Sequence, residues 1–477
     1  MAEQRPNIVL IMTDQQRGDC LGVAGHPDVM TPNLDELACS GSYFPNAYTQ
    51  APVCCPARHS LMTGCEPATN GVLNNQPARI RDPETTLPNL LRKSGYQTAH
   101  VGRSQHQHPS SARYGFEVRE FSPFQSHDSH AHWTVRRTSD SGEFGNWPHL
   151  LNHGMSLCGF RARPWPYDEM FHETTWSINK AIEYLDRRDP EAPYFLSVGV
   201  VAPHPPLVPP APYYDRYDRM ELTPPAIGTW AQRPDNDGIG SGIHSGHVPL
   251  RGKQLHTTMA GYYGLINHFD DMLYNLIYRI NVDGQPTTII FTSDHGEQLG
   301  DHYLFRKEKP YQGSVHVPFM MRGYGVPSGH VTDAPVSHID VLPTCCELAG
   351  IDTPSHVEGR SLLSRFRDDE SEWREFLHGE IPHSQWCKTQ PGCHYLVDGT
   401  WKYIWFSGDG REQLFHLAED PRELQDLAAD TAHADTLVAW RKRLVEKLAD
   451  RPEGFVEDGA LVPGREHKGL LPHAVPV

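Results

Sequence analysis

The sequence has no long hydrophobic run and little cysteine. No eighteen consecutive apolar residues occur among its 477, so we expect no membrane-spanning helix. Ten cysteines are too few for a small scaffold held by disulfides. Neither adjacent pair, Cys54-Cys55 or Cys345-Cys346, has the C-x-x-C spacing of zinc or redox sites. We therefore expect most of the cysteines to be reduced, buried or half-buried thiols.

Positive charge is also scarce, because 42 Lys and Arg stand against 59 Asp and Glu, for a formal net charge of −17. Such a chain lacks the basic face that nucleic acid requires, although a locally positive pocket can still bind a small anion. We expect neither nucleic acid nor a membrane as a partner.

The first residues lead directly into an apolar run that begins at Asn7. No basic start, apolar stretch and small-residue cleavage site precede this run, so we expect no signal peptide and a cytoplasmic location. A secreted or periplasmic location is the alternative if a signal has been removed.

The chain does contain a repeated pattern in which an apolar strand is followed by polar residues. It occurs at residues 7–12, 99–102, 194–201 and 287–292, with helical patterns at 33–40, 87–94, 174–188 and 256–280. Continuous apolar strands are typical of a parallel sheet that is covered on both faces. The pattern predicts an α/β fold with a doubly wound, mostly parallel sheet flanked by helices, and a ligand site at the carboxyl ends of the strands.

The pattern also predicts how the chain is divided. Residues 1–370 form the catalytic α/β domain, interrupted by a loop-rich, histidine-rich insertion at 104–172. Residues 371–450 form a small C-terminal α+β domain with a helix at 431–449 and an antiparallel sheet, because Asp-Gly and Gly-Asp-Gly turns separate the apolar runs at 393–398, 401–406 and 412–417. Residues 451–477 form an extended tail. The histidines at 127–132 are interpreted as surface loop residues rather than as a second metal site.

Two features carry chemistry. Asp14 and the pair Asp294-His295 follow two separate apolar strands, so they could hold a hard cation between them, although acids at strand ends also cap helices. Cys54-Cys55-Pro-Ala-Arg58, with the flank His-Ser-Leu-Met-Thr-Gly, has the form C-x-P-x-R.

On these residues the chain resembles the type I, formylglycine-dependent sulfatases of the alkaline phosphatase superfamily. The resemblance implies that a formylglycine-generating enzyme oxidises Cys54 to an aldehyde, and that the hydrated aldehyde attacks the sulfur of a sulfate ester. It also implies a metal site made of Asp14, Gln15, Cys54, Asp294 and His295. Gln15 departs from the acid that the family usually has there. Ca²⁺ is the metal expected by default, with Mn²⁺ as the alternative, because imidazole favours softer ions.

The resemblance further assigns catalytic roles. Arg58 steadies the formylglycine, and His204, in Pro-His-Pro-Pro, donates a proton to the leaving oxygen. Lys307 binds the transferred group, with Lys309 as a competing candidate in the same basic run. Asn75 falls where the family often has an active-site Asn, and we predict that it binds substrate.

One segment departs from the family pattern G-K-x-H, because the chain has Gly102-Arg103-Ser-Gln-His106. Arg103 can replace the lysine as a cation. His106 is our candidate for the base that expels sulfate, with His108 as a fallback and a substrate-binding candidate.

The predicted activity is hydrolysis of carbohydrate or aryl sulfate monoesters. Substrate choice would lie in the loops of residues 104–172. The alternatives are a phosphonate monoester or phosphodiester hydrolase on the same site, and a non-catalytic protein that binds sulfated ligands if Cys54 stays unmodified.

Overall fold

The structure is a computed structural model that describes residues 5–122, 159–234, 250–367, 373–382 and 392–476. The predicted histidine cluster at 127–132 lies outside the described residues. Eight cysteines lie in the described parts; all are free, and all except Cys39 are buried. No helix in these parts is long and apolar enough to cross a membrane.

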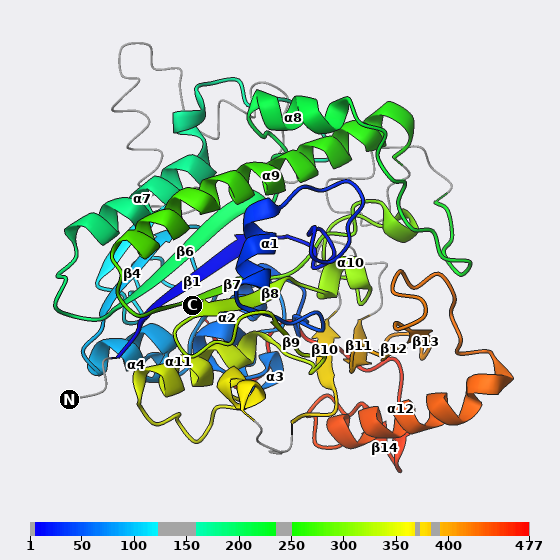
Figure 1. Ribbon diagram of the computed structural model, residues 1–477. Helices are drawn as coiled ribbons and strands as arrows, with labels where there is room; N and C mark the ends of the chain where they lie inside the picture. The colour runs from blue at the N-terminus through cyan, green and yellow to red at the C-terminus, as the bar shows by residue number, and fades with distance from the viewer. Residues whose placement is uncertain (1–4, 123–158, 235–249, 368–372, 383–391, 477) are drawn as a thin grey trace.

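The chain is built around one large sheet in the order β5-β4-β6-β1-β7-β8-β2-β9 (Figure 1). The strands from β5 to β7 run parallel, whereas β8 is antiparallel to both of its neighbours. This confirms the predicted fold class. The strands are β1 (Asn7–Asp14), β2 (Ser42–Tyr43), β4 (Gln97–Gly102), β5 (Val118–Phe121), β6 (Tyr194–Pro203), β7 (Thr287–Ser293), β8 (Phe319–Gly323) and β9 (His330–Val331).

Helices cover both faces of this sheet (Figure 1), and successive side chains of β1 show why. Val9 and Ile11 pack into one hydrophobic core with residues of α7 and α9. Ile8 and Leu10 pack into another with residues of α4 and α11. A strand that is apolar at every position can be buried in this way on both sides. The α-helices are α1 (Pro32–Cys39), α2 (Cys54–Thr63), α3 (Pro67–Asn70), α4 (Leu87–Lys93), α7 (Glu173–Arg187), α8 (Ala211–Asp218), α9 (Gly252–Val282), α10 (Gln312–Val315) and α11 (Val341–Ala349).

A second, antiparallel sheet, β10-β11-β12-β13, lies in the C-terminal part of the chain. Helix α12 (Ala434–Leu448) packs on it through Trp440, Leu444 and Leu448. The sequence pattern predicted this helix and three of the strands, but it missed β10, whose short sequence Leu-His-Gly-Glu-Ile has only two large apolar residues. The strands are β10 (Leu377–Ile381), β11 (Cys393–Val397), β12 (Trp401–Phe406) and β13 (Glu412–His416).

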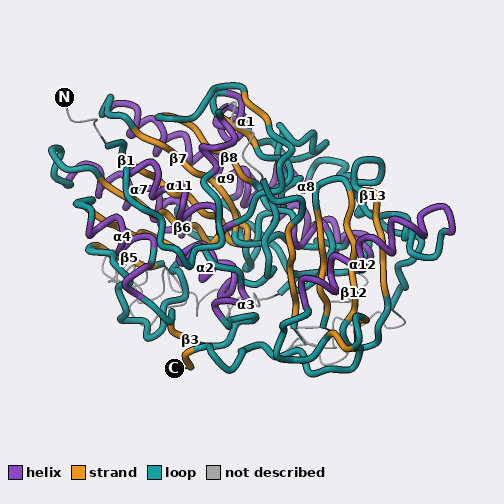
Figure 2. Tube along the Cα trace, turned by 90° about the horizontal axis from the view of Figure 1, so that it is seen from below, coloured by secondary structure: helices purple, strands orange, loops and turns teal. Residues whose placement is uncertain are grey.

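Two details go beyond the predicted pattern. The loop-rich 104–172 insertion also contributes β5, an edge strand of the main sheet. The tail is not simply extended, because β14 (Val456–Glu457) and β15 (Ala460–Leu461) form a hairpin. The end of the tail, β16 (Val475–Pro476), pairs with β3 (Ala78–Arg79), so the C-terminus lies beside that strand (Figure 2). The short 3-10 helices are η1 (Pro83–Thr85), η2 (Glu169–Phe171), η4 (Asp301–Tyr303), η5 (His338–Asp340), η6 (Leu362–Phe366) and η7 (Thr431–His433).

Candidate active site

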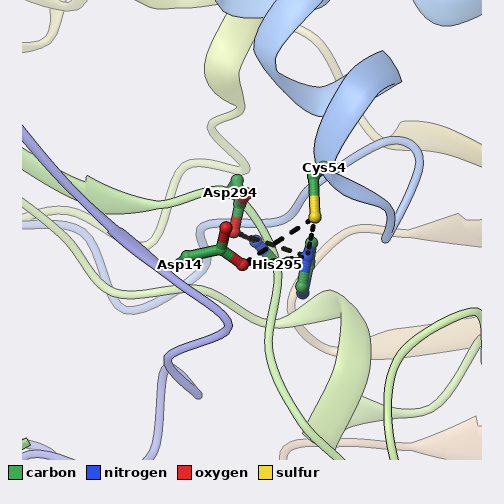
Figure 3. A group of neighbouring side chains, drawn as sticks. All are labelled: Asp14, Cys54, Asp294 and His295. Atoms are coloured by element: carbon green, nitrogen blue, oxygen red, sulfur yellow. Dashed lines mark hydrogen bonds and ion pairs between the residues drawn. The ribbon is translucent and has the colours of Figure 1, made fainter. Parts of the chain in front are cut away.

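The carboxyl ends of β1 and β7 meet the first residue of α2 at a buried cluster. Asp14 ends β1, Asp294 and His295 follow β7, and Cys54 begins α2 (Figure 3). Their potential ligand atoms all lie within 4.8 Å of one another. Because β1 and β7 are adjacent parallel strands, their ends place these side chains at one edge of the sheet, as the sequence pattern predicted.

Cys54 lies at the centre of this cluster. Its Sγ is 3.0 Å from Lys307 Nζ and 3.3 Å from His295 Nε2. Burial and the Asp14 carboxylate raise the pKa of the thiol, but Lys307 and His295 outweigh them and lower it to about 6. The surroundings of residue 54 therefore stabilise a negative charge at this position.

Hydrogen bonding fixes the orientation of His295. Its Nδ1 lies 2.9 Å from the Gly296 carbonyl oxygen; a carbonyl only accepts, so Nδ1 carries the proton. Nε2 faces Asp14 Oδ1 and Asp294 Oδ1 at 3.7 and 3.5 Å. In its neutral form, a histidine held in this way presents the Nε2 lone pair to the cluster, as metal-ligating histidines do.

Two buried arginines balance the carboxylates. Arg58 donates to Asp294 Oδ2 at 2.9 Å and to Asp14 Oδ2 at 3.3 Å, and Arg103 donates to Asp14 Oδ2 at 2.8 Å. Burial raises the pKa of Asp14, but the positive groups around it, among them Arg103, hold it well below its usual range. In both aspartates, Oδ2 thus accepts hydrogen bonds from arginine, whereas Oδ1 faces His295.

Gln15 lies next to this cluster, and its side-chain oxygen Oε1 makes no hydrogen bond with the described residues. Its backbone N–H donates to Asp294 Oδ1 at 3.1 Å, and its Nε2 donates to Glu297 Oε2 at 2.5 Å. Its Oε1 is buried and has no hydrogen-bond partner among the described residues. A buried polar atom without a partner is costly, and an amide oxygen is a suitable ligand for a hard cation. Asp14, Cys54, Asp294 and His295 thus form a cluster that could hold a metal ion, and Gln15 beside it offers a further oxygen.

Glu297 was not predicted from the sequence, although it follows Asp294-His295-Gly296 directly. Besides the Gln15 amide, its carboxylate accepts the backbone N–H groups of Leu299 and Arg306. It joins the end of β1 to the loop that carries Lys307. Only the fold reveals this role, because the partners lie up to 282 residues away in sequence.

Of the two competing lysines, the structure brings Lys307 to Cys54. Burial lowers the pKa of Lys307, but Cys54 and the nearby aspartates raise it above its usual range. Lys309 is buried and lies near Cys393, at the C-terminal sheet. Lys307 is therefore the lysine whose ammonium group can bind an anion at residue 54.

His204 follows β6 at the same edge of the sheet. Its backbone N–H donates to the Asp14 carbonyl at 3.1 Å, and its Nδ1 donates to the Pro205 carbonyl at 2.7 Å. Burial and the charge of Lys307 hold the pKa of His204 well below its usual range. The imidazole is therefore neutral around pH 7 in the absence of an anion.

The segment after β4 places Arg103 and His106 together. Arg103 lies 3.1 Å from His106 Nε2 and donates to it. Burial and Arg103 hold the pKa of His106 well below its usual range, which makes it a neutral acceptor. Gln105, at the position of the family's histidine, donates instead to Ser197 Oγ. His108 is half-buried, and its backbone carbonyl accepts a bond from Tyr114.

Asn75 lies against the start of α2, where its Oδ1 accepts the Cys55 backbone N–H at 2.9 Å. It is half-buried. The structure thus places this predicted substrate-binding residue beside the residue that follows Cys54.

A second group of potential ligands lies at the C-terminal sheet and consists of Glu380 in β10, His394 in β11 and His467 in the tail. Both Glu380 oxygens are held by Arg451 at 2.9 Å, and the rings of His394 and His467 stack 4.6 Å apart at 9°. Two stacked parallel rings cannot both contain one ion in their planes, so this arrangement is a packed polar cluster and not a metal site.

Comparisons with known proteins cover nearly the whole chain. The sulfatase family model matches residues 6–351, and the model of the C-terminal part of N-sulphoglucosamine sulphohydrolase matches residues 300–450. An arylsulfatase of Clostridium perfringens is 35% identical over 96% of this chain and 98% of its own length. The multifunctional alkaline phosphatase superfamily protein PehA of Trinickia caryophylli is 30% identical over 90% of this chain and 92% of its own length. The crystal structure of a phosphonate monoester hydrolase of Agrobacterium radiobacter superposes with a TM-score of 0.75 at 26% identity, covering 93% of this chain and 96% of that one.

Proposed function

Because the chain belongs to the sulfatase family and is a sulfatase enzyme of the alkaline phosphatase superfamily, we propose that it hydrolyses sulfate monoesters at residue 54. The observation that carries this proposal is the surroundings of Cys54 Sγ, which lies 3.0 Å from the Lys307 ammonium and within a buried set of side chains that could hold a metal ion. The arylsulfatase relative supports aryl sulfates as substrates, and carbohydrate sulfates belong to the same proposal.

The proposed cofactors are a formylglycine made from Cys54 and one divalent metal. When hydrated, the aldehyde supplies one hydroxyl for attack on sulfur and a second whose deprotonation releases sulfate. Asp14, Gln15, Asp294 and His295 would hold the metal, which would polarise a sulfate oxygen. Ca²⁺ is the proposed metal and Mn²⁺ the alternative, because the carboxylate and amide oxygens suit a hard cation whereas the imidazole favours a softer one.

Three side chains of the site, Lys307, Arg58 and His106, have separate roles in the proposed reaction. Lys307 binds the transferred group through its ammonium, and Arg58, which donates to Asp14 and Asp294, steadies the formylglycine. His106, which lies beside Arg103, is the proposed base that accepts a proton during release of sulfate.

His204 is proposed to donate a proton to the leaving oxygen, and this role requires the charged imidazole. A bound sulfate anion opposes the Lys307 charge that lowers the His204 pKa, so substrate itself favours protonation. Nδ1 is already engaged with the Pro205 carbonyl, which leaves Nε2 as the donor atom.

The rival activity is hydrolysis of phosphonate monoesters or phosphodiesters. It is favoured by the likeness to the phosphonate monoester hydrolase, and these substrates are monoanions like a sulfate monoester. Unmodified Cys54 would instead favour a protein that binds sulfated ligands.

One panel of substrates tests the proposal. Matured, metal-loaded enzyme is assayed with 4-nitrophenyl sulfate, a sulfated monosaccharide, a phenylphosphonate monoester and a phosphodiester in one buffer. We expect the highest kcat/KM for a sulfate monoester. A phosphonate or diester that exceeds it by orders of magnitude would assign the chain to the rival activity.

A further inference from the structure

Helix α2 starts at the proposed nucleophile without a local cap. Its N-cap residue is Val53, whose side chain cannot accept a hydrogen bond. Pro56 has no N–H, so the first turn presents the N–H groups of Cys54 and Cys55. The latter donates to Asn75 Oδ1 at 2.9 Å. The start of the helix therefore depends on a side chain 20 residues further along the chain.

The segment that carries Asn75 is held by the C-terminal tail. The Leu73 N–H donates to the Gly469 carbonyl, and the Leu471 N–H donates to the Gly71 carbonyl, each at 2.9 Å. Beyond these bonds, β16 pairs with β3. The tail thus forms backbone hydrogen bonds before Asn75 and strand pairing after it.

Close packing supports the same contact. Gly71 has φ of 78°, and a Cβ there would lie 2.9 Å from the Ala474 backbone nitrogen. A Cβ on Gly469 would lie 2.2 Å from Asn74 Nδ2. Leu471 is only 3% exposed. The tail therefore packs closely against Gly71 and the Asn74 side chain, directly before Asn75.

The start of the tail, residues 464–467, contacts the C-terminal sheet. His467 is buried, lies 3.2 Å from Glu380 Oε2 and stacks on His394. The Gly464 N–H donates to the Ser407 carbonyl at 2.8 Å. The tail therefore links the C-terminal sheet to the segment beside α2, and its end lies next to β3 in Figure 2.

We propose that Asn75 is a positioning residue for residue 54, and that the C-terminal tail, residues 464–476, holds Asn75 in place. This inference rests on the proposed function, in which residue 54 is the nucleophile. It changes the part expected of Asn75 from contact with substrate to orientation of the helix that carries the nucleophile.

A double-mutant cycle tests the coupling. Asn75→Ala and deletion of residues 470–477 are each expected to lower kcat for 4-nitrophenyl sulfate by about tenfold, the effect of one lost hydrogen bond, with KM unchanged. Because the tail acts through Asn75, the combined variant should lose no more than either single variant. Additive losses, a raised KM in place of a lowered kcat, or full activity of the truncated chain would overturn the proposal.

Two further variants keep the test independent of folding defects. Leu471→Ala weakens the same contact without shortening the chain and should also lower kcat. Leu461→Ala, in the hairpin that packs on the C-terminal sheet, is the matched control and should leave kcat at the level of the unaltered enzyme. If kcat falls in both leucine variants, the tail contributes only to general stability, and the proposal is overturned.

Amide hydrogen exchange separates this inference from the proposed function. In peptides that contain Cys55, Asn75→Ala and the truncation should each increase exchange of the first-turn amide, whatever the substrate. Unchanged exchange would refute the contact. Increased exchange in a protein that does not hydrolyse sulfate esters would refute the proposed function alone.

Discussion

At the scale of single residues, the balance of charge around residue 54 decides what the site can bind. Two carboxylates, Asp14 and Asp294, face two buried arginines, and Lys307 lies 3.0 Å from Cys54 Sγ. A divalent metal would add positive charge, and Gln15 in place of an acid leaves that charge less compensated. The site therefore favours an anion, even though the whole chain is strongly acidic.

Removing one proposed metal ligand should remove the metal and the activity together. Asp294→Asn replaces a carboxylate that faces His295 Nε2 at 3.5 Å, so metal content and kcat/KM should fall together, the latter by roughly a hundredfold or more. Elemental analysis of the purified variant is the measurement. Asp409→Asn, on an exposed turn, is the control. A variant that retains stoichiometric metal would show that the site is misplaced.

The proposed role of His204 predicts a dependence on the leaving group. His204→Ala should slow alkyl or sugar sulfates by about a hundredfold or more, because their alkoxides need a proton, and nitrophenyl sulfate much less. Rates with a series of esters of increasing leaving-group pKa provide the measurement. An equal loss for all esters would remove His204 from this role.

At the scale of elements, the site depends on a loop that the fold must hold in an unusual conformation. Between β7 and α10, five non-glycine residues adopt positive φ, namely Leu299, His302, Tyr303, Arg306 and Glu308. Such conformations persist only where the surroundings fix them. Glu297 supplies part of that constraint by accepting two backbone N–H groups of the loop.

Glu297→Ala should therefore displace Lys307 and Gln15 together. We expect kcat/KM to fall by about tenfold or more and metal affinity to weaken, because the variant frees two buried N–H groups and the Gln15 amide. Metal titration and kinetics are measured together. Glu375→Ala, at a site whose side chain is 76% exposed, should change neither. A Glu297 variant with normal metal affinity would contradict the role assigned to this residue.

How far sequence predicts such elements depends on how local their causes are. The apolar runs predicted β1, β6 and β7, and the polar residues after them predicted the cluster at the strand ends, because parallel strands bring these ends to one edge. Strand β10 has no comparable pattern. The contacts of Glu297, Asn75 and the tail join residues distant in sequence, so no local periodicity could reveal them. The choice between Lys307 and Lys309 likewise required the loop conformation.

At the scale of the whole molecule, buried neutral histidines set the pH range of stability. Burial lowers the pKa of each below the value of 6.5 for a free side chain, to about 4 for His59 and His338 and about 3 for His100 and His378. Below pH 6.5 the unfolded chain binds protons that the folded chain does not. The stability contributed by these histidines is therefore complete above pH 6.5 and is lost as pH falls toward 4.

For one such histidine, the loss between pH 7 and pH 5 is about 2 kcal/mol. His378→Gln should remove about that amount from the pH dependence of the free energy of unfolding, as measured by denaturant titration at both values. His356→Gln, at an exposed position, should leave the pH dependence unchanged. An unchanged dependence in the His378 variant would show that this imidazole is not neutral in the folded state.

The account as a whole depends on the chemical state of residue 54. The most direct measurement is peptide mass spectrometry of protein that has been expressed with a formylglycine-generating enzyme, compared with its turnover of 4-nitrophenyl sulfate. The account predicts an aldehyde at residue 54, a thiol at Cys55, and activity in proportion to the aldehyde fraction. Full activity in protein whose residue 54 is entirely a thiol would contradict it.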